Sequence, residues 1–72
     1  MHLDISADLN CEDETGFVWT FLDDATDPAR IAPGEVVVAG TPLSAAMCEV
    51  VDVVAKPAGT VVHLRVLEPL SR

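Results

Sequence analysis

Acidic side chains, with the single amide Asn10 among them, gather in the first thirty residues, where they could contact cations or basic proteins. Residues 1–30 hold eight acids against one base, so this part carries −7 of the total charge of −8. Such a charge attracts basic surfaces and repels phosphate backbones and anionic membranes. We therefore predict a basic protein partner, without direct nucleic-acid or membrane binding. The predicted contact residues are Asn10, Glu12, Asp13, Glu14, Asp23, Asp24 and Asp27.

Part of this acidic segment has the spacing of a calcium loop. Asp8, Asn10 and Glu12 stand at alternate positions, but Asp13 occupies the place that needs Gly and Trp19 the place that needs Glu. The pattern favours a solvated loop in which Asp8 or Asn10 bonds the backbone of its own turn. Metal or small-ligand binding at this loop (residues 8–14) is one alternative. Imitation of nucleic acid by spaced carboxylates is another.

The cysteines and histidines form no motif typical of metal binding or catalysis. Cys11, Cys48, His2 and His63 lack the close ligand pairs of zinc sites. Cys48 and His63 could pair as nucleophile and base, but an exposed strand histidine beside Arg65 is the simpler interpretation. We predict a non-enzymatic protein without a cofactor, in which Cys48 packs as an apolar residue. The first residues do not read as an export signal, which predicts a cytoplasmic protein with free thiols.

The elements that must position these residues are predicted to be β-strands, because half of the residues are hydrophobic and eleven are Val. Turn signals at Pro33–Gly34 and Lys56–Gly59 separate runs of alternating or β-branched residues. Asp27 and Pro28 begin a short helical turn, which Ile31 anchors to the core. The predicted strands are residues 2–9, 17–22, 35–39, 47–55 and 60–67.

Five short strands, with one helical turn between strands 2 and 3, predict an all-β fold. We expect residues 1–72 to form a single small five-stranded β-barrel domain, SH3-like or OB-like, with marginal stability at this length. Glu49 and Asp52 break the alternation of the fourth strand, which predicts a β-bulge near Val50–Val51.

The second predicted strand carries all the aromatic side chains of the chain. Phe17, Trp19 and Phe21 share one face, and we expect this face in the core rather than on a binding platform. Residues 43–46 are expected to connect the third and fourth strands, and residues 68–72 to form a tail. Exposed valines on edge strands also allow a homodimer through strand pairing.

Two resemblances extend over longer stretches. The runs DLNCEDETG and WTFLD, with PGEVVVAG and VVHLRVL, resemble a set of small acidic proteins of high-GC Gram-positive bacteria that brings no known function. PGEVVVAGTPL, AAMCEVV and PAGTVVHLRV, within residues 33–66, are similar to the biotinyl and lipoyl carrier domain. That family carries its modified lysine in a hairpin, within Ala-Met-Lys-Met. Cys48 stands at that position here, so the resemblance implies no carrier function.

Overall fold

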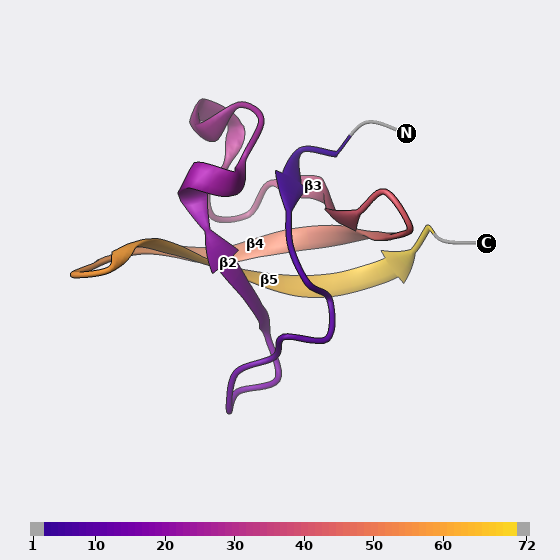
Figure 1. The fold of residues 1–72 in the computed structure, drawn as a ribbon, viewed down its shortest axis with the longest axis horizontal. Helices are drawn as coiled ribbons and strands as arrows, with labels where there is room; N and C mark the ends of the chain where they lie inside the picture. Colours follow the sequence, from indigo (N-terminus) through magenta and orange to yellow (C-terminus); the bar gives the residue numbers. More distant parts are fainter. Residues whose placement is uncertain (1–2, 71–72) are drawn as a thin grey trace.

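Five β-strands form one mixed sheet within residues 3–70, the part of the chain that the computed structural model describes. The strand order is β1-β3-β4-β5-β2, and the sheet curls into a half-barrel (Figure 1). The predicted all-β fold of the small-barrel kind is confirmed. The strands are β1 (Ile5–Ser6), β2 (Val18–Phe21), β3 (Val36–Thr41), β4 (Ser44–Lys56) and β5 (Gly59–Pro69).

The centre of the sheet is an antiparallel meander of β3, β4 and β5. Lys56 pairs with Gly59, so the predicted turn joins β4 to β5. The connection from β3 to β4 is shorter than predicted, because Thr41 pairs with Ser44 and leaves only two loop residues. Thr41 Oγ1 accepts hydrogen bonds from the backbone N–H groups of Leu43 and Ser44, at 3.3 and 3.1 Å. This hydroxyl closes the turn and allows β4 to begin within the predicted connection.

Two bulges shape the β4–β5 hairpin. Val50 pairs with Leu64 and Asp52 with His63, which leaves Val51 as an extra residue and confirms the predicted bulge. A second irregularity was not predicted and leaves Leu67 of β5 unpaired between two ladder positions. β5 also runs on to Pro69, so the prediction of a tail beginning at residue 68 is wrong.

The outer strands β1 and β2 complete the half-barrel. β1 lies parallel to β3, and β2 lies antiparallel to β5. The buried Thr20 of β2 donates a hydrogen bond from its hydroxyl to the Ser6 carbonyl of β1, at 2.8 Å. This bond joins the two ends of the sheet.

The first predicted strand, residues 2–9, is longer than β1. Residue 2 lies outside the described residues. Pairing beyond β1 stops after the Ala7 N–H donates to the Gly40 carbonyl, because a turn closed by Cys11 N–H and the Asp8 carbonyl then leads the chain away.

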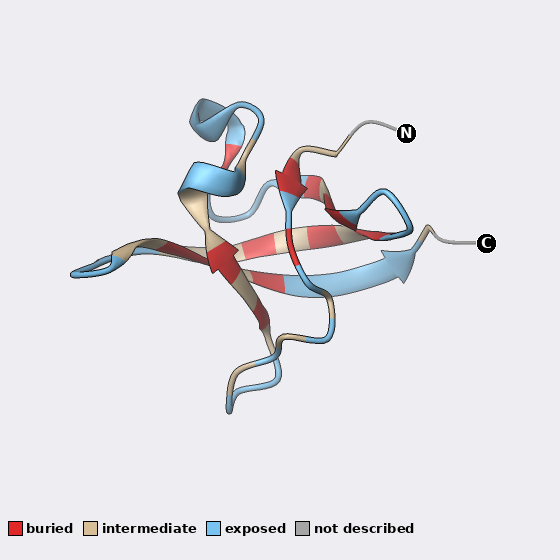
Figure 2. Ribbon diagram, viewed as in Figure 1, coloured by how far each residue is buried: buried red, intermediate tan, exposed pale blue. Residues whose placement is uncertain are grey.

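Most of the buried residues, drawn in red in Figure 2, have small aliphatic side chains. The largest fully buried side chains are Ile5, Leu64, Val18, Val37, Val50, Val62 and Cys48. The expectation that the aromatic face of β2 fills the core is wrong. Val18 and Thr20 are the buried residues of β2, whereas Trp19 and Phe21 are partly buried on the other face. Alanines at 39 and 46 line this interior, and its narrow space suits Val and Ala better than aromatic rings.

Between β2 and β3 the chain makes two 3₁₀ turns, one more than predicted: η1 (Leu22–Asp24) and η2 (Pro28–Arg30). Asp27 caps η2 by accepting a hydrogen bond from Ala29 N–H at 3.2 Å, with Pro28 at the first helical position. Ile31 follows and is buried in the core. The predicted cap and anchor are therefore confirmed. No helix among the described residues has the length and apolar character needed to cross a membrane.

Candidate functional site

The outer face of β2 presents two aromatic rings. Trp19 and Phe21 are partly buried and meet edge to face, with ring centroids 5.5 Å apart. Trp19 pairs with His63 of β5, and Phe21 pairs with Val61. Val61 is buried although it lies outside the main core cluster. The rings therefore rest on the sheet and leave part of their surface to solvent.

Acidic side chains lie at both ends of this strand. The loop before β2 carries Asn10, Glu12, Asp13 and Glu14, and the turns after it carry Asp23, Asp24 and Asp27. All of these residues are exposed except Asp13, which is partly buried. The predicted contact residues thus form two groups, and the loop and the 3₁₀ turns lie at opposite ends of β2 (Figure 1). The aromatic face of β2 lies between them.

Asp13 organises the loop before β2. Its Oδ1 accepts hydrogen bonds from Thr15 N–H at 2.9 Å, from the Thr15 hydroxyl at 2.5 Å and from Phe17 N–H at 3.3 Å. The Thr15 hydroxyl is the main cause that lowers the pKa of the Asp13 carboxyl below 3.8. Asp8 plays a similar part earlier in the loop, where its side chain accepts from Asn10 N–H at 2.9 Å. The prediction that Asp8 bonds its own turn is confirmed.

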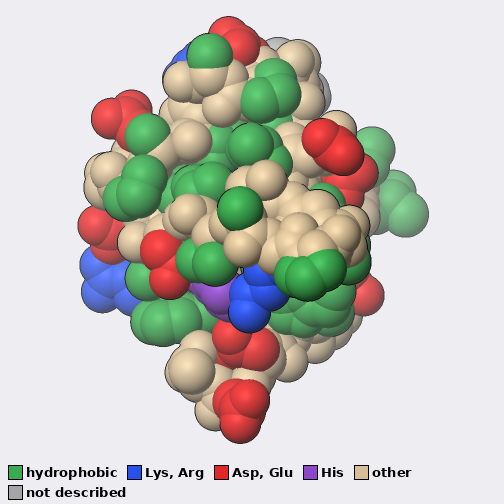
Figure 3. Space-filling view, turned by 90° about the vertical axis from the view of Figure 1, so that its left-hand side faces the viewer, with side chains coloured by type: hydrophobic (Ala, Val, Ile, Leu, Met, Phe, Trp, Pro, Cys, Tyr) green, Lys and Arg blue, Asp and Glu red, His purple; other side chains and the backbone are tan. Residues whose placement is uncertain are grey.

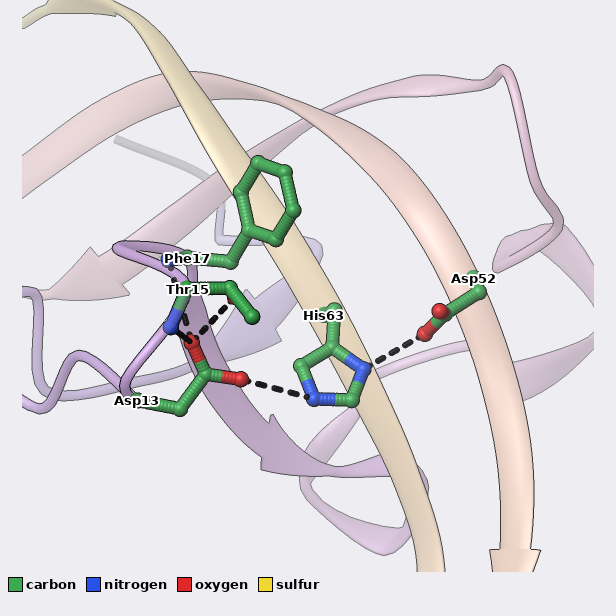
Figure 4. Close-up of a pocket in the computed structure, with 5 residues that line it drawn as sticks. All are labelled: Asp13, Thr15, Phe17, Asp52 and His63. Carbon is green, nitrogen blue, oxygen red and sulfur yellow. Dashed lines mark hydrogen bonds and ion pairs between the residues drawn. The ribbon is translucent and has the colours of Figure 1, made fainter.

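His63 ties this loop to the sheet (Figure 4). Its Nε2 lies 3.2 Å from Asp13 Oδ2, and its Nδ1 lies 2.5 Å from Asp52 Oδ1 of β4. With Thr15 and Phe17, these residues line an open hollow of about 240 Å³. Each ring nitrogen of His63 therefore faces one carboxylate, from the loop on one side and from β4 on the other.

A Cys48–His63 dyad is not formed. Cys48 faces the core and is buried, whereas His63 projects from the opposite face of the sheet. Burial raises the pKa of the Cys48 thiol, which donates to the Ala46 carbonyl at 3.7 Å. The interpretation of Cys48 as an apolar packing residue is confirmed. Arg65 lies next along the outer face and pairs with Glu49 of β4.

Metal ligands do not converge in the part of the chain that the structure describes. Within residues 3–70, no group of three His, Cys, Asp or Glu side chains could hold an ion. The Asp13 and Asp52 carboxylates lie on opposite sides of the His63 ring, and Cys11 and Cys48 are free thiols. His2, which the sequence analysis considered as a zinc ligand together with Cys11, Cys48 and His63, lies outside the described residues. Ligand binding at the loop and nucleic-acid mimicry stay predictions.

The space-filling surface shows acidic side chains around the rim of one face and hydrophobic groups nearer its middle (Figure 3).

Comparison with family models, curated proteins and solved structures finds no significant match to this chain. The resemblance to small acidic bacterial proteins therefore stays a prediction. Cys48, which the carrier-domain resemblance aligns with a lysine in a hairpin, lies in the interior of β4.

Sequence reasoning missed Trp19, Phe21, His63 and Asp52 as parts of this site. The available signal was the strand pairing: a bulge at Val51 turns Asp52 to the same face as His63. The placement of Trp19 beside His63 depends on the pairing of β2 with β5, which no local pattern indicated.

Proposed function

We propose that this chain is a non-enzymatic acidic interaction module, which binds or regulates a partner through a basic segment laid across the outer face of β2. The observation that carries the proposal is the position of Trp19 and Phe21 between two acidic groups. Aromatic faces attract Lys and Arg side chains, and Trp does so best. Exposed carboxylates at both ends of the strand add attraction over a longer range.

The charge of the chain defines the partner class. A net charge of −8 disfavours phosphate backbones and anionic membranes, so the proposed partner is a basic protein segment. A reducing cytoplasmic setting is part of the proposal, since both cysteines are free thiols.

The test uses a labelled peptide of alternating Lys and Arg, with fluorescence anisotropy as the readout. The variant Glu12→Gln/Glu14→Gln/Asp23→Asn should weaken binding at least fivefold and reduce its salt dependence, because it removes three carboxylates beside the strand. Trp19→Leu should weaken binding by about threefold, since an exposed cation–π contact contributes about 0.5–1 kcal/mol.

The control variants separate local contact from total charge. Glu35→Gln removes one exposed carboxylate just before β3, outside the proposed contact residues, and should change affinity less than Glu12→Gln, which removes one carboxylate beside β2. Equal effects of the two variants, or binding that is insensitive to both, would count against the β2 face.

A further inference from the structure

β5 has an uncovered edge over its last five residues. β2 pairs with β5 only from Val61 to Leu64, whereas β5 continues to Pro69. Within residues 3–70, the segment Arg65–Pro69 has only β4 as a neighbouring strand. All five residues are exposed, and Figure 2 shows this end of β5 in pale blue. On either side of the bulge at Leu67, alternate backbone N–H and C=O groups of such an edge point to solvent and can pair with another strand.

The two outermost strands of the sheet are covered by the chain itself. Residues 11–13 run along β2, where Trp19 N–H donates to the Cys11 carbonyl at 3.3 Å and Asp13 N–H to the Phe17 carbonyl at 2.9 Å. At β1, Ile5 forms a bridge with Ala25. The edge of β5 has no comparable cover among the described residues. It also exposes apolar side chains: the exposed fraction is 42 % for Val66 and 47 % for Leu67.

We propose that the edge of β5 over Arg65–Pro69 binds an extended segment of another protein as an additional strand. Addition of a strand satisfies the unpaired backbone groups, and side chains on the two faces give selectivity. Val66 and Leu67 favour apolar side chains in the added strand. Pro69 has no N–H and ends the edge. This surface is separate from the aromatic face of β2, so the inference does not depend on the proposed function.

Charge indicates what kind of segment fits. The Arg65 guanidinium already pairs with Glu49, which leaves Glu68 as the charge of this edge that has no ion-pair partner within residues 3–70. A basic residue in the added strand would complement Glu68. A second copy of this chain fits less well, because each copy carries −8. Pairing of two five-residue edges would also bury much less than the roughly 1,200 Å² of a stable interface.

The experiment titrates the ¹⁵N-labelled full chain with a seven-residue peptide of alternating Val and Lys. We expect amide shifts and slowed hydrogen exchange at residues 65–69. The same peptide with N-methyl groups on alternate amides should bind at least fivefold more weakly, because it cannot form one row of ladder hydrogen bonds. A peptide with Glu in place of Lys should also bind more weakly.

A pair of variants localises the binding. Leu67→Lys should weaken binding of the Val/Lys peptide by about fivefold, because it removes one apolar contact of about 1 kcal/mol. Leu43→Lys makes the same change at a side chain that is 94 % exposed in the β3–β4 turn and should have little effect. The variant Glu12→Gln/Glu14→Gln/Asp23→Asn should still bind at β5, which separates failure of this inference from failure of the proposed function. Equal binding of the methylated peptide, shifts confined to β2, or a dimer that protects residues 65–69 would overturn the inference.

Discussion

Asp13 uses its two carboxylate oxygens for different tasks. Oδ1 accepts hydrogen bonds from Thr15 and Phe17 within the loop, and Oδ2 faces the His63 ring. The loop conformation and its attachment to β5 therefore depend on one ionised group. Glu12 and Glu14 are exposed neighbours in the same loop, so Asp13 holds the backbone that presents them.

We predict that Asp13→Asn changes the acid end of the stability curve. The folded state lowers the pKa of Asp13 below 3.8, so its contribution is complete above that pH and is lost as pH falls through the lower folded pKa. Thermal melts between about pH 5 and 2.5 should therefore show a shallower fall in Tm for Asp13→Asn than for the parent chain. Asp23→Asn makes the same change of charge in η1 and is the matched control. Parallel curves for Asp13→Asn and the parent chain would contradict this role.

Side-chain hydrogen bonds to backbone groups close in sequence could be predicted from the sequence. The Asp27 cap depends on Ala29, two residues away, and the Asp8 turn depends on Asn10. The contact of Asp13 with His63 joins residues fifty positions apart, and it requires both the β2–β5 pairing and the loop conformation. Neither is encoded in a short pattern, so the sequence could not place this contact.

The β3–β4 hairpin shows how one residue can determine an element. Gly40 has φ of +137°, and a Cβ added there would lie 2.2 Å from the Ser44 carbonyl oxygen. The close approach of the two strands beside the two-residue loop therefore requires glycine. Gly34 also has a positive φ, of +90°, but an added Cβ would have no atom within 4 Å.

We predict that Gly40→Ala lowers the free energy of unfolding by about 3 kcal/mol or more. A positive φ costs a residue with a side chain about 1–2 kcal/mol, and an overpacked contact adds about 1–3 kcal/mol. Gly34→Ala should show only the conformational cost of about 1–2 kcal/mol. Urea unfolding of both variants provides the comparison. Similar losses at the two positions would show that the Ser44 contact is not decisive.

Turns and bulges were easier to predict from the sequence than which face of a strand is buried. The Lys56–Gly59 turn and the Val51 bulge follow from residues close in sequence. In β2, by contrast, Val18 and Thr20 on one face compete with Trp19 and Phe21 on the other. Alternation cannot decide between two largely apolar faces, and the narrow interior of the half-barrel selects the smaller side chains.

Across the whole molecule, excess negative charge works against the folded state. Two ion pairs, Arg30 with Asp4 and Arg65 with Glu49, offset part of it. The remaining acids repel one another more strongly when the chain is compact than when it is unfolded.

We predict that added salt stabilises this protein. Raising NaCl from about 0.01 to 1 M shortens the Debye length from about 30 to about 3 Å and weakens this repulsion. Tm should therefore rise with salt. The variant Glu12→Gln/Glu14→Gln/Asp23→Asn carries three fewer negative charges and should gain less. A falling Tm would mean that the ion pairs outweigh the repulsion.

The pairing of β2 with β5 also constrains how this protein is made. β2 lies in the first third of the chain, whereas its ladder partners are Val61 to Leu64 in the last strand. A nascent chain leaves the ribosome from its N-terminus, so β2 emerges long before those partners. The β3–β4 hairpin can form while synthesis continues. The sheet can be completed only after residues 61–64 have been translated, and until then the aromatic strand has no partner from β5.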